Sequence, residues 1–212
     1  MSEIGAEGAP RSATARSSAA AARVDRGRQA QPSGWWGMVL FLCSEVTLFG
    51  TLIGSYFYLD FQAHSWPPNH IKSPEVLAPS IATAVLLATI PMMFMAERSA
   101  RRGRRWATVR WMSVATVVQL AYLAAQVLLF RHDLNDFTPQ GSAYGSIYFT
   151  LLAAHHAHVV LGIVINLAVI GVLILRGLDN YWLIGVRGAA LYWYVVPVIG
   201  VVVLLTIISP SL

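Results

Sequence analysis

Residues 141–162 read GSAYGSIYFTLLAAHHAHVVLG, and the interpretation of the whole chain begins there. The stretch starts in a Gly/Ser-rich turn and enters an apolar run that extends to Leu175. His155, His156 and His158 lie inside this run. Ionisable side chains are costly at that depth, so they are kept where a bundle interior, a partner or a polar lipid head group receives them. These rings therefore need polar partners within the bundle, on a neighbouring protein or in the lipid head groups.

The composition places this chain in a membrane. It has 212 residues, of which 56% are hydrophobic and only 12% are charged, and its mean hydropathy is +0.58. The core of one soluble domain of this size cannot bury so much apolar surface. The single cysteine, Cys43, excludes an internal disulfide and a metal site built on cysteines.

Five apolar runs have lengths close to the ~20 residues that cross a hydrocarbon core. They are Trp35–Leu59, Leu77–Ala96, Trp106–Phe130, Tyr144–Leu175 and Ala189–Ile208. Pro91 and Pro197 lie inside the second and the fifth run, where the missing N–H predicts a kink. The sequence therefore predicts an all-α polytopic membrane protein, a bundle of five transmembrane helices within residues 35–212.

Residues 1–34 differ in composition from this bundle. They are rich in Ala, Ser, Gly and Arg and hold almost no large apolar side chain. Such a segment cannot offset the entropy lost on ordering, so we predict a disordered basic cytoplasmic tail. An organelle transit peptide has a similar Arg- and Ser-rich character. Glu3, Glu7 and Asp25 argue against that alternative.

The positions of the basic residues predict the orientation of the bundle. All of the 15 Lys and Arg residues except Lys72 and Arg131 fall in the tail, at the second–third loop or in the fourth–fifth connection. Because cytoplasmic loops carry an excess of Lys and Arg, the N-terminus is expected inside and the C-terminus outside. This pattern also accounts for the net charge of +5, so nucleic acid is not expected as a partner.

Glu45 is the first candidate for chemistry. It lies about 15 Å along the first span from Trp35, near the middle of the bilayer. A carboxyl group at that depth either fixes helix packing through a hydrogen bond, or it handles protons or binds a lipid head group. We favour the second role. The chain shows no complete catalytic site of its own.

His155 and His158 are three residues apart and share a helical face, while His156 points about a third of a turn away. An i, i+3 histidine pair can bind a metal with help from another helix. The remaining histidines all lie in outside loops, so a metal site is not expected. We expect His155 and His158 to form hydrogen bonds across helices or to lipid head groups. Either ring is a natural partner for Glu45, directly or through a lipid head group or water.

Glu97, Arg98 and Trp66 are candidates at the membrane boundaries for hydrogen bonds to lipid or to another helix. Glu97 closes the second span and has i, i+4 spacing to Arg101, which favours an interfacial ion pair. Arg98 follows Glu97 directly. Trp66 opens a stiff Trp-Pro-Pro sequence in the first outside loop, and tryptophan is typical of the interface.

Together these motifs resemble subunit III of the haem–copper oxidases, in the five-helix form that lacks the first two helices of the family. The resemblance covers Trp35–Leu212. It rests on Ser44-Glu45 with Phe49, on Trp66-Pro67-Pro68, on Ala96-Glu97-Arg98, on Gly141-Ser142 through His155, His158 and Gly162, and on Tyr192-Trp193.

Three places depart from the family pattern. The last-helix motif Tyr-Trp-His-Phe-Val-Asp reads Tyr-Trp-Tyr-Val-Val-Pro at residues 192–197, so its histidine is Tyr194 and its aspartate is Pro197. Leu123 stands where a glutamate is usual, and His156 replaces the glycine between the histidines. The lost polar groups are expected to partner one another in the family, so their joint loss leaves no orphaned group.

The resemblance implies a non-catalytic subunit of an aerobic terminal oxidase in a bacterial inner membrane. That enzyme reduces oxygen to water and translocates protons. Haem and copper are then expected in the partner catalytic subunits, with subunits I and II as neighbours, and this chain is expected to bind structural phospholipid and to support proton uptake. A supercomplex with other respiratory complexes is a further class of partner.

Several alternatives stay open. Cytochrome c is the first expectation for the electron donor and quinol is the second. Within the family, a subunit III-like protein of nitric oxide reductase is the alternative. In another class, a small proton-coupled transporter can use Glu45 and the histidines as its relay.

The orientation can be tested by cysteine labelling after Cys43 is replaced. We predict that His70→Cys and Asn135→Cys react with a membrane-impermeant thiol reagent from outside intact cells, because their loops lie opposite the basic ones. Gly103→Cys should react only after permeabilisation. Reaction of Gly103→Cys in intact cells contradicts the predicted orientation.

Overall fold

The computed structural model describes residues 33–68, 71, 76–178 and 180–209. The chain divides into two units, Met1–Gly37 and Met38–Leu212. Only Ser33–Gly37 of the first unit is described, as the start of a helix, so residues 1–32 of the predicted tail lie outside the described residues.

All regular structure in the described residues is helical. The helices are α2 (Ser33–Gln62), α3 (Leu77–Leu87), α4 (Thr89–Arg101), α5 (Arg105–Asp136), α6 (Ala143–Arg176) and α7 (Asn180–Ile208). Five stretches are long and apolar enough to cross a membrane, namely Gly34–Gln62, Leu77–Arg101, Arg105–Asp136, Ala143–Arg176 and Trp182–Ile208. The predicted all-α fold with five spans is confirmed, while its orientation stays a prediction.

The second span is divided at Ala88 into α3 and α4. Pro91 has no N–H to donate to the carbonyl group of Leu87, so the regular pattern of helical hydrogen bonds cannot continue. The Thr89 hydroxyl group donates to the carbonyl group of Leu86 at 2.6 Å beside the break. The interruption predicted from Pro91 is therefore present, whereas α7 continues through Pro197 as one helix.

Two helices are longer than the apolar runs that predicted them. α5 continues beyond Phe130 to Asp136, and α7 begins at Asn180 rather than near Ala189. Arg187 lies in this added part of α7, with its Nε atom 3.9 Å from Oε1 of Glu97 on α4. An apolar run ends where the hydrocarbon is expected to end, but a helix with polar partners continues past that level.

Local sequence signals explain the two ends of α6. The Ser142 side chain accepts a hydrogen bond from the Gly145 N–H at 3.0 Å, as an N-cap residue does. A Cβ atom on Gly145 would lie 2.6 Å from the carbonyl oxygen of Thr138, so the turn requires glycine there. At the other end Gly177 has a φ of 88°, and the Arg105 guanidinium donates to the carbonyl group of Ile174.

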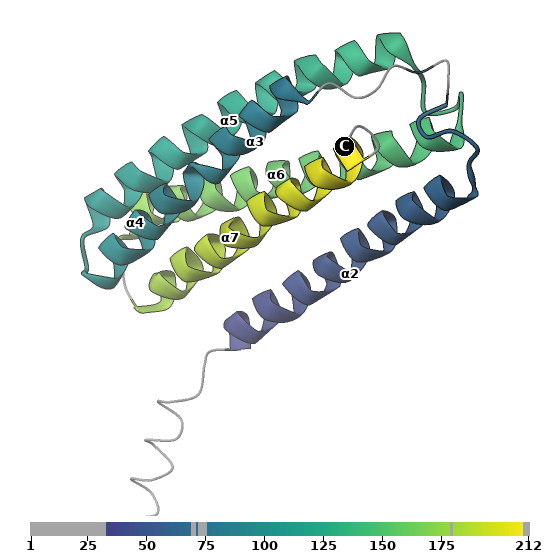
Figure 1. Cartoon of the computed structure of the whole chain (residues 1–212). Coiled ribbons are helices and arrows are strands. Elements are labelled where there is room, and N and C mark those ends of the chain that lie inside the picture. The colour runs from purple at the N-terminus through teal and green to yellow at the C-terminus, as the bar shows by residue number, and fades with distance from the viewer. Residues whose placement is uncertain (1–32, 69–70, 72–75, 179, 210–212) are drawn as a thin grey trace, which may run out of the picture. The chain divides into compact units, whose positions relative to one another are not determined.

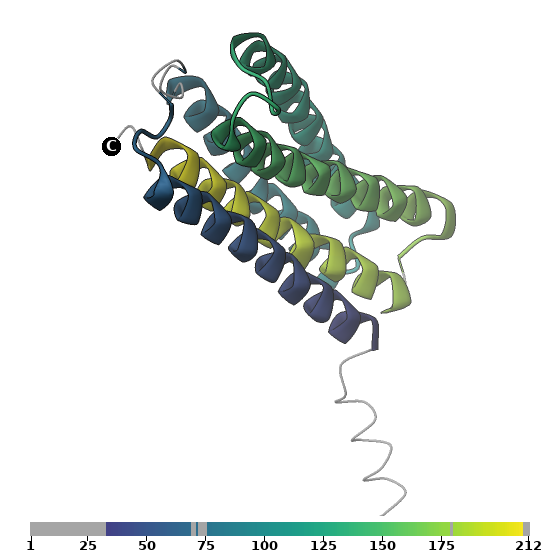
Figure 2. The same ribbon diagram turned by 90° about the vertical axis from the view of Figure 1, so that its right-hand side faces the viewer.

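α5 and α7 share the same three neighbours in the bundle. Both pack closely against α3, α4 and α6. α2 runs beside α7 in both views (Figures 1 and 2) but has no close backbone approach to any other described helix. Side chains therefore make the contacts between α2 and its neighbours.

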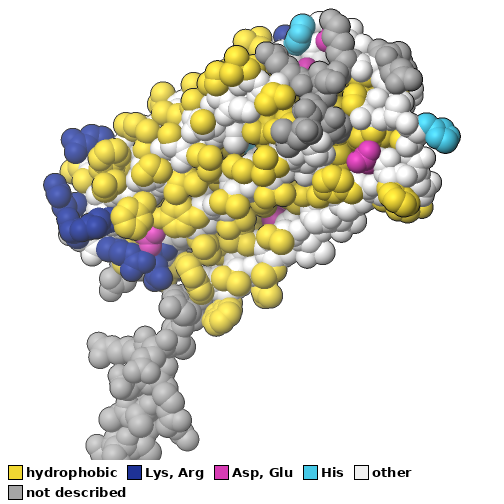
Figure 3. Space-filling view, viewed as in Figure 1, with side chains coloured by type: hydrophobic (Ala, Val, Ile, Leu, Met, Phe, Trp, Pro, Cys, Tyr) yellow, Lys and Arg dark blue, Asp and Glu magenta, His cyan; other side chains and the backbone are white. Residues whose placement is uncertain are grey.

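Charged side chains are distributed unevenly over the face in Figure 3. Lys and Arg side chains gather at the end that carries the connection between α4 and α5, and hydrophobic side chains cover the sides. Arg101, Arg102 and Arg104 are exposed in this connection. Exposed arginines in this connection suit the polar head-group region next to an apolar membrane-spanning surface.

Gly162 on α6 offers a test of the close contact with α7. A Cβ atom there would lie 2.7 Å from Cε3 of Trp193 and 3.0 Å from Cε1 of Tyr192. We predict that Gly162→Ala lowers the free energy of unfolding by about 1–3 kcal/mol, because both buried rings must shift. Gly171→Ala, also on α6 but with nothing within 4 Å of its Cβ position, is the matched control and should be neutral or stabilising. Thermal unfolding in detergent makes the comparison, and equal losses contradict the close packing.

Candidate functional site

Glu45 and His158 form a direct hydrogen-bonded pair between α2 and α6. The contact joins Oε2 of Glu45 to Nε2 of His158, and the two side chains are 13% and 15% exposed. Nδ1 of His158 lies 2.6 Å from the carbonyl oxygen of Ala154, so this nitrogen carries a proton and donates it. Phe49 packs its ring edgewise against the imidazole, with 5.1 Å between the ring centroids.

This geometry leaves one proton to be shared between the carboxyl group and the imidazole. Because Nδ1–H of His158 is committed to Ala154, the contact with Glu45 is either a carboxylate with an imidazolium or a carboxylic acid with a neutral ring. Both forms keep one hydrogen bond between the two helices. A hydrogen bond at this contact therefore requires one proton between the two side chains.

His155 on α6 faces other neighbours than this pair. Its ring is 3% exposed, and its Nε2 atom is 3.5 Å from the hydroxyl group of Tyr122 on α5. A Cβ atom on Gly200 of α7 would lie 2.8 Å from the ring. Of the two predicted partners of Glu45, the structure selects His158. Residues three apart differ by about 60° around a helix, which is enough to face different neighbours.

Tyr192 adds a second contact to the Glu45–His158 region. Its hydroxyl group donates to the carbonyl group of His158 at 2.9 Å. Its ring stacks on Phe41 of α2 with centroids 6.0 Å apart. The first tyrosine of the Tyr192-Trp193-Tyr194 sequence thus links α7 to both helices that carry the pair.

Comparison with known proteins assigns the chain to a family. A family model described as cytochrome c oxidase subunit III matches residues 22–210. The chain belongs to this family. The match includes every described residue of the Glu45–His158 region, and it extends into the segment before the first span.

Relatives in the subunit III family come from two kinds of oxidase. Cytochrome c oxidase subunit 3 of Synechocystis is 24% identical over 81% of this chain and 73% of its own length. The Drosophila melanogaster protein of the same name is 29% identical, over 81% of this chain and 67% of its own length. Cytochrome bo(3) ubiquinol oxidase subunit 3 of Pseudomonas aeruginosa is 25% identical over 80% of each.

Glu97, at the family's Ala-Glu-Arg motif, is the centre of a second polar cluster. Arg101 donates to its Oε1 atom from Nη2 at 2.6 Å and from Nε at 3.1 Å. The Tyr194 hydroxyl group donates to Oε2 at 2.9 Å. The Glu97 side chain is only 13% exposed, against 54% for Arg101. The i, i+4 pair predicted from sequence is present, and its carboxylate is more buried than an exposed interfacial pair requires.

Tyr194 explains how this chain tolerates its departure from the family's last-helix motif. It stands at the histidine position of that motif, and its hydroxyl group binds the Glu97 carboxylate. Its neighbour Trp193 donates from Nε1 to the hydroxyl oxygen of Thr89 at 2.6 Å. The tyrosine therefore keeps a polar contact at this position between α7 and α4.

The other predicted residues lie apart from Glu45. Trp66 packs edgewise between Tyr56 and Tyr144, at 5.4 Å and 5.0 Å between ring centroids. Arg98 is exposed, and no hydrogen bond or ion pair joins it to another described residue. In the described part of the chain, no group of three or more His, Cys, Asp or Glu side chains is arranged to hold a metal ion.

The structure also contains polar contacts that the sequence analysis did not identify. The Asn166 amide donates to Oε1 of Gln119 at 3.0 Å between α6 and α5. The Tyr148 hydroxyl group donates to Oδ2 of Asp133 at 2.7 Å between the same helices. Polar residues inside apolar runs were the available signal, since such residues face other helices rather than lipid.

The Glu45–His158 contact can be tested with substitutions that separate the effect of the charge from the effect of the side-chain volume. Glu45→Gln keeps the volume and a hydrogen bond to His158, so it should lower the free energy of unfolding by about 1 kcal/mol or less. Glu45→Ala should cost about 3 kcal/mol, because it leaves a void and an unpaired imidazole nitrogen. Ser44→Ala is the matched control, since the exposed Ser44 hydroxyl group only contacts Phe41 of its own helix.

Denaturant unfolding of the detergent-solubilised chain measures these differences. The loss from Glu45→Ala should shrink when His158 is already alanine, because the partner that it orphans is then gone. Equal effects of Glu45→Gln and Glu45→Ala, or full additivity with His158→Ala, rule out the pair as a stabilising contact.

Proposed function

We propose that this chain is the non-catalytic subunit III of an aerobic haem–copper terminal oxidase that reduces oxygen to water and translocates protons. The observation that carries the proposal is the Glu45–His158 pair, formed by two family motifs in a chain that matches the family model over residues 22–210. Subunits I and II are its proposed neighbours, and their haem and copper supply the oxygen chemistry. A bacterial inner membrane is the proposed location.

Cytochrome c is the proposed electron donor of the complex. Relatives named cytochrome c oxidase subunit 3, from Synechocystis and Drosophila melanogaster, support this choice. The Pseudomonas aeruginosa relative named for ubiquinol oxidase matches at a similar identity. A quinol oxidase subunit is therefore the second candidate.

Proton handling is the proposed role of Glu45. The carboxyl group lies inside a span, and its hydrogen bond to His158 accommodates a proton on either partner. Both side chains are partly exposed at the surface of this chain, so a group of the neighbouring catalytic subunit can exchange a proton with them without unfolding of the bundle. A subunit that holds a proton here supports proton uptake by the neighbouring catalytic subunit.

Phospholipid binding is proposed at the Arg-rich end of the bundle. Arg98 is exposed next to the buried Glu97 carboxylate, and Arg102 and Arg104 are exposed in the following connection. Guanidinium groups bind phosphate through paired hydrogen bonds. Exposed apolar residues of α4 such as Phe94 and Met95 offer acyl chains a surface one turn from Arg98.

Purification and deletion test the proposed role. The affinity-tagged chain should co-purify with haem proteins from gently solubilised membranes, and the preparation should show a haem spectrum. Deletion of the chain should leave haem and copper in the core oxidase but shorten its active lifetime during turnover. A chain that purifies without haem proteins contradicts the proposal and favours a transporter. Loss of haem from otherwise intact core subunits contradicts the non-catalytic role.

A further inference from the structure

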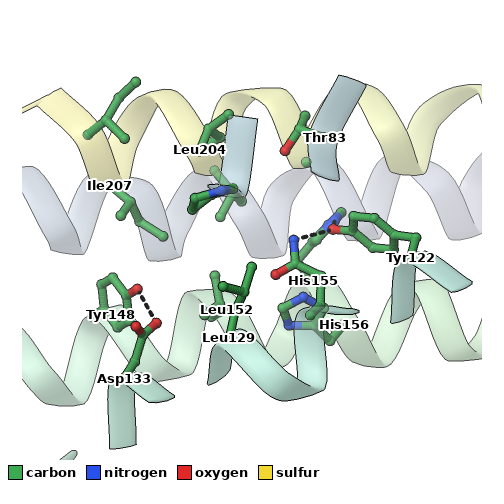
Figure 4. Close-up of a pocket in the computed structure, with 15 residues that line it drawn as sticks. Thr83, Tyr122, Leu129, Asp133, Tyr148, Leu152, His155, His156, Leu204 and Ile207 are labelled. Carbon is green, nitrogen blue, oxygen red and sulfur yellow. Dashed lines mark hydrogen bonds between the residues drawn. The ribbon is translucent and has the colours of Figure 1, made fainter. Parts of the chain in front are cut away.

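A small internal cavity lies between α3, α5, α6 and α7, apart from the Glu45–His158 pair. Its volume is about 40 Å³, and its lining includes Tyr122, Asp133, Tyr148, His155 and His156. Figure 4 shows Asp133 and Tyr148 joined at one end of the cavity and Tyr122, His155 and His156 at the other. The rest of the lining is mostly apolar, so these groups are the polar chemistry of an otherwise hydrocarbon-like interior.

His155 presents one unpaired nitrogen in this cavity. The Gln126 amide donates to the Tyr122 hydroxyl oxygen at 3.1 Å, which leaves the Tyr122 hydroxyl proton to face Nε2 of His155 at 3.5 Å. Nε2 then accepts, and the ring proton of the neutral imidazole is on Nδ1. Among the described residues this buried Nδ1–H has no partner.

His156 presents the complementary group. It hydrogen bonds to the backbone of Leu152, one turn earlier, and its Nε2 atom is buried without a partner among the described residues. The hydrogen bond to Leu152 therefore uses Nδ1–H, and Nε2 is an acceptor with a free lone pair. The centroids of the His155 and His156 rings are 5.7 Å apart, a separation that one small molecule can bridge.

Close packing holds the His155 ring in its position. The backbone of Gly200 lies against the His155 ring, so closely that a Cβ atom there would be 2.8 Å from it. The His156 ring has Tyr122 and Phe130 as neighbours, at 6.3 Å and 6.5 Å between centroids. An unpaired donor and an unpaired acceptor in a dry interior are both costly. Their partner must therefore come to them within the cavity.

We propose that this cavity is a water-binding site, in which one water molecule accepts from Nδ1–H of His155 and donates to Nε2 of His156. A site needs roughly 10–15 Å³ of such volume to hold a water, so the volume is sufficient. A water molecule can accept a hydrogen bond from the donor and donate one to the acceptor at the same time. A cation does not fit, because only one of the two nitrogens offers a lone pair, and an acyl chain leaves both groups unpaired.

Water can reach this site from the aqueous end of the bundle at Asp133. Asp133 lies near the end of α5 and is partly exposed, and Tyr148 links it to α6. From Tyr148 to His155 the distance along α6 is about 10 Å at 1.5 Å per residue. The site does not depend on the proposed oxidase role, since it follows from the contacts of this chain alone.

Water-edited solid-state NMR of the full-length chain in liposomes, with isotope-labelled histidine, tests the proposal. Magnetisation should pass from water to the rings of His155 and His156 quickly, and to His158 slowly, because Glu45 and Ala154 already occupy both of its nitrogens. Absence of transfer to His155 and His156 overturns the proposal.

Two variants distinguish a single bridging water from a cavity that is hydrated without such a bridge. His156→Phe keeps an aromatic ring but removes the acceptor, so transfer to His155 should be lost. His156→Gln retains an acceptor, and transfer to His155 should persist. The resonances of His158, which pairs with Glu45 of α2, report whether each variant keeps its fold. Undiminished transfer to His155 in a folded His156→Phe chain overturns the bridge, as does its loss in both folded variants.

Discussion

The hydrogen bond between Glu45 and His158 is the contact on which the position of α2 depends. No backbone approach holds α2 to the other described helices, so side chains must do it. Apolar side chains alone are a weak means, because lipid tails are as apolar as a helix surface. A buried carboxyl group and an imidazole have no equivalent partner in hydrocarbon, so their pairing favours one position of α2. The ring contacts of Phe41 with Tyr192 and of Phe49 with His158 then pack around that pair.

The remaining helices combine two kinds of contact, and α7 carries both. Two glycines allow α6 and α7 to approach closely. A side chain at Gly162 would collide with Trp193, and a side chain at Gly200 would collide with His155. The polar contacts of α7 diverge: successive residues 192, 193 and 194 bind the carbonyl group of His158, the hydroxyl group of Thr89 and the carboxylate of Glu97. Successive helical residues point about 100° apart, so three neighbouring side chains can bind two other helices. This is why a tyrosine replaces the family's histidine without leaving Glu97 with Arg101 as its sole close partner.

The sequence predicts the number of spans and the break near Pro91, because each follows from apolar length or proline chemistry. It left His155 and His158 as equal partners of Glu45. The rise per residue of a helix sets the level of a residue in the membrane, but only packing sets which neighbour its side chain faces. A rotation of α6 by about 60° decides whether His155 or His158 faces Glu45. The contacts Tyr194–Glu97 and Tyr148–Asp133 were missed for the same reason. The helix ends at Asp136 and Asn180 were missed because polar contacts, not hydropathy, extend a helix beyond the hydrocarbon.

The three histidines on α6 face two different environments. His158 faces α2 and Glu45, whereas His155 and His156 face the cavity beside α5. A proton that arrives at the Glu45–His158 pair changes the charge between α2 and α6 only. His155 and His156 keep their hydrogen bonds, because neither has a hydrogen bond to Glu45. α2 is also the helix without close backbone contacts, so it can adjust to a change of charge while α3–α7 keep their packing. The contacts of α6 are therefore divided between the pair that holds α2 and the cavity inside the α3–α7 bundle.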